Sequence, residues 1–300
     1  MKIFFRLFFI LAIFFLGTPA LADNFANGVA FFQNAQYQRA LFEFQQGSQK
    51  EDPYCQYALG LMYAIGNYIE RSDAKAFSWI KKAADQGLAP AQNYLGFMYA
   101  EGVGTEKNDV LAAQMYKKAA DQRYPDAKYN LATLYLSGRG VEQNISEAIR
   151  LMRLVAARGL PEAQYALGVL YASGKGVKQS DERAMHWFHE AAKKGYPLAQ
   201  NKIGVLLIEG RGAEKDDIKA ANWFTYAAQQ GYAPAQYNLG RLYETGTGVP
   251  ESRIHATELY RLAAAQGNEQ AKVKLRQLGE SQSAGKKGTR KQNERSSVFR

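Results

Sequence analysis

The sequence predicts an all-α solenoid built from helix-turn-helix repeats, and three observations support this fold class. A segment that reads AQNYLGFMYAEG at residues 91–102 occurs in six related copies, each 36 residues from the next. Five copies are followed by a turn with two glycines, and every copy has a polar capping residue at one fixed position. A constant period of this length is typical of arrays in which each unit packs only on its neighbours.

The first helix of each copy is expected to contain the AQNYLGFMYAEG segment. A small residue stands at its centre in all six copies, namely Gly60, Gly96, Ala132, Gly168, Gly204 and Gly240. A glycine inside a helix costs about 1 kcal/mol relative to alanine. We therefore expect a partner helix to approach closely at these positions. Prolines such as Pro125 and Pro161 suit the first turn, where the missing N–H has no helical partner.

A glycine turn and a capped second helix follow. Paired glycines allow a tight reversal with positive φ, and the pairs are Gly102 and Gly104, Gly138 and Gly140, Gly174 and Gly176, Gly210 and Gly212, and Gly246 and Gly248. The expected N-caps, whose side chains can accept hydrogen bonds from first-turn amides, are Ser72, Asn108, Asn144, Ser180, Asp216 and Ser252. The helix then stops at a glycine in most copies. Arg123 takes that place in the second copy, where a left-handed conformation would cost about 1–2 kcal/mol.

Residues 1–22 predict a secretory signal peptide that is cleaved after Ala22. Lys2 and Arg6 precede an apolar run at 7–16, and the segment ends with small residues. This run of ten residues is short against the roughly 20 that cross a bilayer. We therefore expect an exported protein, periplasmic or secreted, with no transmembrane segment after cleavage.

The rest of the chain divides by composition and period. We expect an opening helix pair at 23–51, six repeats at 52–267, a closing helix at 268–280 and a disordered basic tail at 281–300. The closing helix has Ala271, Leu275 and Leu278 as its apolar stripe, with Lys272 and Lys274 facing water. The tail carries six Lys/Arg and one Glu, and residues 23–280 carry 30 basic and 27 acidic residues. A charge of only +3 over the body does not indicate a nucleic-acid groove.

The joint pattern AxYxLGxxYxxGxGVxxDxxxAxxWxxxAAxxG resembles the Sel-one-like repeat (SLR) family, a relative of the tetratricopeptide repeats with exported bacterial members. The resemblance covers the six units at 52–267, and residues 23–51 resemble a looser tetratricopeptide-like capping pair. It implies a right-handed superhelix whose concave face is lined by the first helices. It also implies a non-enzymatic protein–protein interaction scaffold, in envelope assembly, signalling regulation or host-cell contact.

Two rows of first-helix residues would then point into the concave groove. The candidate partner-binding residues are Tyr57, Asn93, Phe97, Tyr129, Tyr165, Asn201, Tyr237 and Arg241. Tyrosine and asparagine are good recognition residues, although the tyrosines can equally pack between neighbouring helices. The row that holds Phe97 and Arg241 changes from copy to copy, so we expect it to select the partner, which would be a protein or an extended peptide.

The alternative hypothesis is a cell-wall-related enzyme or penicillin-binding protein. Ser72 with Lys75, and Ser78 with Lys81, have the Ser-x-x-Lys spacing of penicillin-recognising enzymes. The accompanying Ser-Asp-Asn and Lys-Thr-Gly motifs are missing from the sequence, and both serines stand at repeat positions with a structural explanation. We therefore predict no catalytic residues.

Two further features receive structural interpretations. Cys55 aligns with five alanines, which indicates a buried small residue rather than a nucleophile. His186 and His189 stand at positions that hold varied polar residues in other copies, so no metal or cofactor is predicted. A weaker possibility is that the tail contacts anionic surfaces through Lys286, Lys287, Arg290 and Lys291.

Overall fold

The computed structural model describes residues 22–66 and 68–279, which form fifteen helices and contain no strand. The all-α repeat fold predicted from the sequence is therefore confirmed. The predicted signal peptide lies outside the described residues except for Ala22, and the predicted tail at 281–300 also lies outside them. Signal cleavage and tail disorder remain predictions.

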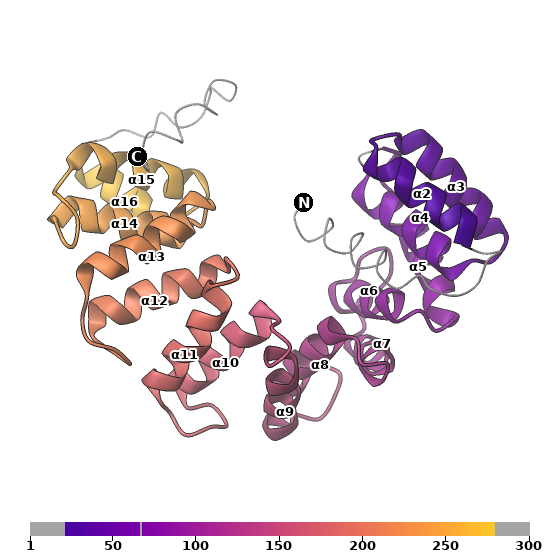
Figure 1. The fold of residues 1–300 in the computed structure, drawn as a ribbon, viewed down its shortest axis with the longest axis horizontal. Coiled ribbons are helices and arrows are strands. Elements are labelled where there is room, and N and C mark those ends of the chain that lie inside the picture. Colours follow the sequence, from indigo (N-terminus) through magenta and orange to yellow (C-terminus); the bar gives the residue numbers. More distant parts are fainter. Residues whose placement is uncertain (1–21, 67, 280–300) are drawn as a thin grey trace. The chain divides into compact units, whose positions relative to one another are not determined.

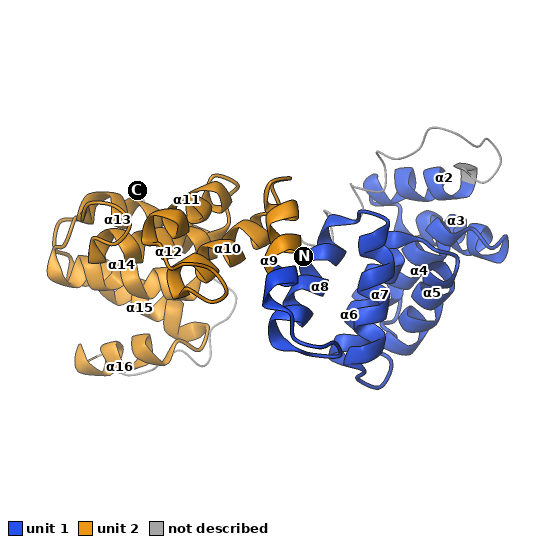
Figure 2. Ribbon diagram, turned by 90° about the horizontal axis from the view of Figure 1, so that it is seen from below, with its two compact units in different colours: residues 1–148 blue, residues 149–300 orange. Residues whose placement is uncertain are grey.

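The chain divides into two compact units, residues 1–148 and 149–300 (Figure 2). In each unit consecutive helices form hairpins that stack on their neighbours (Figure 1). The first unit contains α2 (Ala22–Gln33), α3 (Tyr37–Gln49), α4 (Pro53–Ile65), α5 (Asp73–Asp85), α6 (Ala89–Glu101), α7 (Asp109–Asp121), α8 (Pro125–Ser137) and the start of α9 (Ile145–Ala156). The second contains the rest of α9, α10 (Pro161–Ser173), α11 (Asp181–Ala192), α12 (Pro197–Glu209), α13 (Asp217–Gln229), α14 (Ala233–Thr245), α15 (Arg253–Ala265) and α16 (Glu269–Gln277).

In four repeats the central glycine of the first helix packs against an aromatic ring of the second helix, whereas Gly60 packs against Ile80. A Cβ added at Gly204 would lie 2.6 Å from Cε1 of Phe224 on α13. Gly168 has the same relation to Phe188 on α11, and Gly96 to Tyr116 on α7. The expected close approach is confirmed, and it offsets the helix-propensity cost of glycine because a larger residue would separate the two helices.

The second glycine of the turn also contacts the preceding repeat. Gly246 and Gly248 have φ values of 67° and 69°, in the left-handed region. A Cβ at Gly248 would overlap the backbone carbonyl of Asp217 on α13, whereas one at Gly246 would make ordinary contacts with Glu251, no nearer than 3.4 Å. The first glycine is therefore required for its conformation, and the second both for its conformation and for lack of space.

All six predicted N-caps accept a hydrogen bond from a first-turn amide. Asn108 Oδ1, for example, accepts from Leu111 N at 3.0 Å. Arg123, which replaces the glycine at the end of α7, adopts the left-handed conformation with φ of 67°. The sequence thus locates both ends of these helices, and the unfavourable conformation at Arg123 is a local cost of this copy.

Buried glutamines link successive repeats. Gln92 Nε2 donates to the carbonyl of Ala84 at 3.3 Å, and its Oε1 accepts from Gln122 Nε2 at 2.8 Å. Gln122 Nε2 also donates to the carbonyl of Gly87. Gln200 and Gln236 accept in the same way from the glutamines thirty residues later, Gln230 and Gln266. These bonds satisfy side-chain amides that would be costly to bury unpaired.

One of these bridges is incomplete in the second unit. Lys194 stands where Gln122 and Gln230 stand in other copies, and its Nζ donates to the Gly159 carbonyl at 2.7 Å. The Oε1 of the buried Gln164 is left with no hydrogen-bond partner. An unpaired buried oxygen costs about 1–3 kcal/mol, so this repeat is bonded less well than its neighbours.

The closing helix α16 differs in one detail from the expectation. Ala271 and Leu275 are buried, as the apolar stripe predicts. Lys274 does not simply face water, because its Nζ lies 2.9 Å from Oε2 of Glu244, which also accepts from the Tyr260 hydroxyl at 2.5 Å. Burial alone would raise the pKa of Glu244, but the hydrogen bonds from Tyr260 and Lys274 outweigh burial and hold this pKa below its usual range.

Candidate functional site

In the first unit, the large exposed apolar side chain on the first helices of the repeats is Phe97 of α6. This phenyl side chain is 42% exposed, and its ring centroid lies 5.6 Å from that of Tyr94. Asn93 is half-buried, and its Oδ1 accepts from Asn130 Nδ2 of α8 at 2.9 Å. Tyr129 is also half-buried. Phe97 is therefore the predicted site residue that this unit presents most fully.

Tyr57 requires a correction to the predicted row. It is 0% exposed and packs edge-on against Tyr94. Its hydroxyl has no hydrogen-bond partner in the described structure, and burial raises the pKa of Tyr57 well above its ordinary value. Tyr57 belongs to the core, as the packing alternative for these tyrosines predicts, and it cannot contact a partner on this surface.

In the second unit, Arg241 of α14 is the exposed member of the predicted set. Tyr237 is half-buried against Tyr260, with ring centroids 5.7 Å apart. Asn201 is only 8% exposed, and its Oδ1 accepts from Asn238 Nδ2 at 2.9 Å. Asn201 thus acts mainly as an internal link between α12 and α14. Among the predicted residues of this unit, Arg241 is the one that offers an exposed charge.

Tyr165 of α10 lies in an aromatic cluster. Its ring centroid is 5.6 Å from that of Phe188 and 5.5 Å from that of Tyr196. It remains half-buried, so only part of the ring can be contacted. The predicted residues of the row that begins with Tyr57 thus differ in exposure, although they share one position in the repeat.

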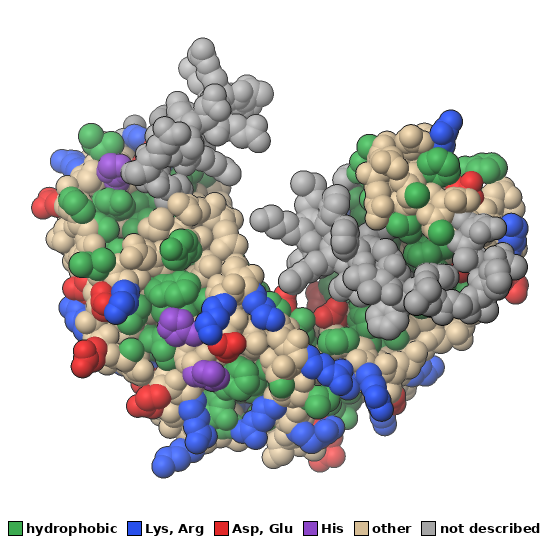
Figure 3. All heavy atoms as spheres, viewed as in Figure 1, with side chains coloured by type: hydrophobic (Ala, Val, Ile, Leu, Met, Phe, Trp, Pro, Cys, Tyr) green, Lys and Arg blue, Asp and Glu red, His purple; other side chains and the backbone are tan. Residues whose placement is uncertain are grey.

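The histidines of α11 pack against tryptophans. The His189 ring lies 5.4 Å from Trp223, and the His186 ring 5.2 Å from Trp187, measured between centroids. Burial is the main cause that lowers the pKa of His189. Figure 3 shows the histidines among hydrophobic side chains on the surface of the second unit. Over residues 22–66 and 68–279, no group of three or more His, Cys, Asp or Glu side chains could hold a metal ion.

In both Ser-x-x-Lys pairs the lysine side chain contacts a group other than the serine. Ser72 Oγ accepts from Lys75 N as the cap of α5. The Lys75 ammonium lies over the ring of Tyr63, 5.3 Å from its centroid. Ser78 is exposed, and the lysine three residues later, Lys81, forms an ion pair with Asp85 at 2.6 Å. A lysine that activates a serine must lie within hydrogen-bond reach of it, and these lysines are engaged elsewhere.

Cys55 is fully buried on α4. Burial raises the pKa of its thiol, and the neighbouring Asp52 carboxylate adds to the effect. The thiolate, which is the reactive form of cysteine, is therefore disfavoured. This agrees with the structural interpretation of Cys55.

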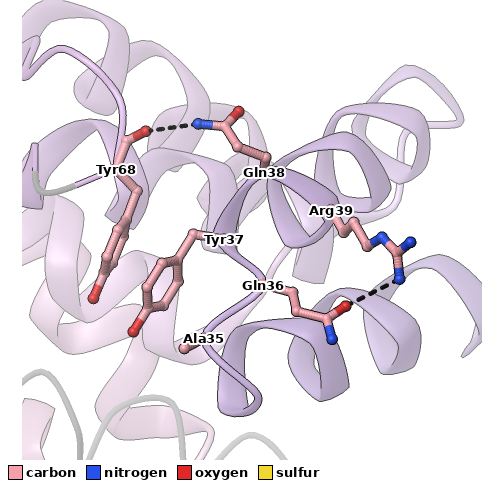
Figure 4. A pocket seen from close by; sticks show the side chains of 6 residues that line it. All are labelled: Ala35, Gln36, Tyr37, Gln38, Arg39 and Tyr68. Atoms are coloured by element: carbon pink, nitrogen blue, oxygen red, sulfur yellow. Dashed lines mark hydrogen bonds between the residues drawn. The ribbon is translucent and has the colours of Figure 1, made fainter.

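Two adjoining hollows in the opening helix pair were not predicted from the sequence. The larger one, of about 670 Å³, is lined by Ala35, Gln36, Tyr37, Gln38, Arg39 and Tyr68. Figure 4 shows the Tyr37 and Tyr68 rings side by side, and their centroids lie 3.5 Å apart. The first repeat lacks the two-glycine turn, and Tyr68 stands in the turn that replaces it. This departure, next to an aromatic-rich opening pair, is the signal that could have found the hollow.

None of the described helices is both long and apolar enough to span a bilayer.

Repeated helix pairs with a few exposed, variable side chains define a helical-repeat scaffold. The family model described as the Sel1 repeat matches residues 53–88, 89–124, 125–160, 161–196, 197–232 and 233–268. The chain therefore belongs to the Sel1 repeat family, whose repeats generally mediate protein interactions.

Two solved structures show the same fold. The chain is 35% identical to a Sel1 repeat protein from Oxalobacter formigenes, with a TM-score of 0.73, and the match covers 86% of this chain and 76% of that one. It is 30% identical to a protective antigen with an SLR fold from uropathogenic Escherichia coli, with a TM-score of 0.68 and 80% of this chain covered. The match spans 53% of the Escherichia coli protein. No curated protein matches the sequence.

Proposed function

We propose that the protein is an exported, non-enzymatic scaffold that binds another protein or an extended peptide on the exposed surface of its first helices. The observation that carries the proposal is the presentation of Phe97, a large apolar side chain 42% exposed beside Tyr94 at a position that varies between repeats. Exposed aromatic and arginine side chains are the types that dominate binding energy at protein interfaces. Arg241 supplies the second type in the other unit.

The repeat pattern separates residues that pack the helices from residues that could select a partner. The glycines, caps and glutamines that recur in register are used in packing, so they are unavailable for selecting a partner. Phe97 aligns with Thr133, Val169 and Arg241 in other copies. Selectivity in a repeat scaffold comes from such positions, because only they differ from one repeat to the next. Within this set, Tyr57 is excluded by burial.

Export is proposed from the leader-like residues 1–22, which end in small residues before Asp23. The antigen from uropathogenic Escherichia coli, a protective antigen by its description, is consistent with such a location. We propose a periplasmic or secreted protein that acts in envelope assembly, signalling regulation or host-cell contact. N-terminal sequencing of the mature protein tests this, since it should begin at Asp23.

The interaction is tested by crosslinking and affinity capture from native envelope extract. Phe97→Ala and Arg241→Glu should each reduce recovery of a captured protein, without loss of helicity by circular dichroism. Loss of a hot-spot side chain costs about 1–2 kcal/mol or more, a five- to thirtyfold weakening. Val110→Ala removes an exposed apolar side chain from α7, and Lys175→Glu reverses an exposed charge in a turn, so these serve as matched controls. Equal recovery with all four variants contradicts the proposal.

The same preparation tests the enzymatic alternative. A chromogenic β-lactam should be neither hydrolysed nor retained covalently by the purified chain. Turnover that disappears in Ser72→Ala or Ser78→Ala would overturn the non-enzymatic assignment.

A further inference from the structure

Two tyrosines from different elements are stacked face to face beside the opening helix pair. Tyr37 begins α3, and Tyr68 stands in the segment between α4 and α5. Their ring centroids lie 3.5 Å apart, and their ring planes differ by 20°. Aromatic pairs in proteins usually have centroids about 4.5–7 Å apart. The facing atoms of these two phenol rings are therefore in van der Waals contact.

Neighbouring side chains hold the two rings in this arrangement. Phe32 of α2 packs edge-on against both rings, with its centroid 5.2 Å from that of Tyr37 and 5.6 Å from that of Tyr68. Gln38 of α3 donates a hydrogen bond from its Nε2 to the Tyr68 carbonyl at 3.4 Å (Figure 4). Contacts from both helices of the opening pair thus fix Tyr68 against Tyr37.

The two phenol groups also point the same way. Figure 4 shows both hydroxyls on one side of the stack. The hydrogen bond between them raises the pKa of Tyr68 above its ordinary value. With the rings stacked and the hydroxyls aligned, the Cε carbons next to each hydroxyl lie near each other. In a phenoxyl radical these carbons share the unpaired electron with the oxygen, so they are the atoms at which two tyrosyl radicals couple.

This geometry and its accessibility distinguish Tyr37 and Tyr68 from other tyrosines that meet. Three other tyrosine pairs among the described residues have centroids 5.5–6.4 Å apart and planes that differ by 39–74°, namely Tyr57–Tyr94, Tyr165–Tyr196 and Tyr237–Tyr260. Tyr37 and Tyr68 are both half-buried, and both line the hollow of about 670 Å³. An oxidant in solution can therefore reach the stacked pair.

We propose that Tyr37 and Tyr68 form an oxidative modification site, at which a haem peroxidase with hydrogen peroxide joins the two rings through a carbon–carbon bond. The bond would tie the opening helix pair to the first repeat. A disulfide within the chain cannot do this, because Cys55 is the only cysteine of the sequence. The site is separate from the first-helix surface proposed to bind a partner protein.

The reaction balances with hydrogen peroxide as the oxidant. Each tyrosine loses its phenolic hydrogen, as one proton and one electron, and becomes a phenoxyl radical. The two radicals form one bond between a Cε carbon of each ring. The hydrogens on those two carbons then move as protons to the phenolic oxygens, which restores both aromatic rings. Hydrogen peroxide takes up the two protons and two electrons and becomes two molecules of water.

The product requires one ring to move. The new bond lies in the plane of each aromatic ring once aromaticity is restored, so the rings cannot stay stacked. Tyr68 belongs to an irregular turn rather than to a helix, and it borders the hollow, which leaves space for its ring to turn.

The test treats the purified full chain with a haem peroxidase and hydrogen peroxide, followed by proteolysis and mass spectrometry. We expect dityrosine fluorescence and one main cross-linked peptide pair, which joins Tyr37 to Tyr68 and is lighter by two hydrogen atoms than the separate peptides. The yield per chain should stay constant on dilution through the micromolar range, because the two rings belong to one molecule. Absence of this peptide pair, or a yield that falls with dilution, overturns the proposal.

Conservative variants test the assignment to these two residues. Tyr37→Phe and Tyr68→Phe keep an aromatic ring but remove the phenolic hydrogen, so each should reduce dityrosine fluorescence to the level seen without peroxide. Tyr226→Phe is the matched control, because Tyr226 is 54% exposed and belongs to the second unit. It should react as fully as the unaltered chain. Fluorescence that persists in Tyr37→Phe or Tyr68→Phe, or that is lost in Tyr226→Phe, contradicts the assignment.

Discussion

The two glycines of one turn provide a controlled test of how successive repeats contact each other. Gly246 and Gly248 have nearly equal φ values of 67° and 69°. Alanine at either position therefore pays a similar cost, about 1–2 kcal/mol for a left-handed conformation. Only Gly248 lies against the backbone of the preceding repeat, where a Cβ would meet the Asp217 carbonyl and lie 2.9 Å from the Ile218 nitrogen.

The additional cost at Gly248 follows from the kind of atoms that it meets. Backbone atoms of α13 cannot rotate away as a side chain can, so the helix and the turn must separate. Overpacking of this kind costs about 1–3 kcal/mol. We expect Gly248→Ala to lower the free energy of unfolding by about 2–5 kcal/mol in total, when the conformational cost is included. Gly246→Ala should cost only the conformational part.

Urea unfolding followed by tryptophan fluorescence measures this difference. Trp187 and Trp223 lie on α11 and α13, so a Trp79→Phe background confines the signal to the second unit. With slopes of about 1–3 kcal/mol per molar urea, the additional cost of about 1–3 kcal/mol should place the midpoint of Gly248→Ala below that of Gly246→Ala by about 1 M at the centre of both ranges. Equal midpoints for the two variants would refute the close contact between the turn and α13.

For three other substitutions the structure sets the direction in which folding stability should change. Arg123→Gly should raise the free energy of unfolding by about 0.5–1 kcal/mol, because glycine accepts φ of 67° without strain; an unchanged urea midpoint counts against this. Lys194→Gln should give Gln164 Oε1 its missing partner and stabilise the second unit by about 0.5–1.5 kcal/mol, measured in the same assay. Two hydrogen bonds from Arg139 hold the pKa of Asp109 below its usual range. The ionised carboxylate therefore stabilises the folded chain above about pH 4, and this contribution is lost as the pH falls further and Asp109 becomes protonated. Arg139→Gln should therefore flatten the acid side of a plot of melting temperature against pH, and an unaltered acid side would mean that the pair contributes nothing.

Local structure follows from the repeat because each signal acts over a few residues. The caps at Ser72 and Asn108, and the glycine turns, depend only on neighbouring backbone atoms. The same information exists in every copy, so one ambiguous position is resolved by the others. Packing of Gly204 on Phe224 was also predictable in kind, since a mid-helix glycine needs compensation. That Phe224 supplies the ring was not predictable, because the residue that faces the glycine depends on the angle between the two helices.

Exposure at the candidate site was less predictable. Tyr57 and Tyr237 occupy the same repeat position, yet the first is fully buried and the second half-buried. Their surroundings depend on which side chains the neighbouring repeats place beside them, and this is not encoded in the period. The glutamine bridges could have been predicted from the sequence, although we did not predict them. Gln92 and Gln122 stand thirty residues apart, as do Gln200 and Gln230, which is a recurrent spacing that points to paired buried amides.

The opening pair lies outside the repeat, so the comparison of copies gives no help there. Tyr37 was expected to belong to a tetratricopeptide-like pair, but its stacking on Tyr68 depends on the irregular turn of the first repeat. Phe42 and Phe44 are chemically identical, and the helical phase of α3 decides which is exposed. These positions illustrate why non-repeating segments require the structure.

The central claim is that the partner binds on the first-helix surface, and site-specific photo-crosslinking tests it most directly. A photoreactive phenylalanine analogue is placed at Phe97 on α6 or, as the control, at the exposed Val110 on α7, and the chain is irradiated in native envelope extract. We expect an adduct of one defined mass from position 97 and none from position 110. An adduct from position 110 alone would place the partner on the second helices and contradict the account.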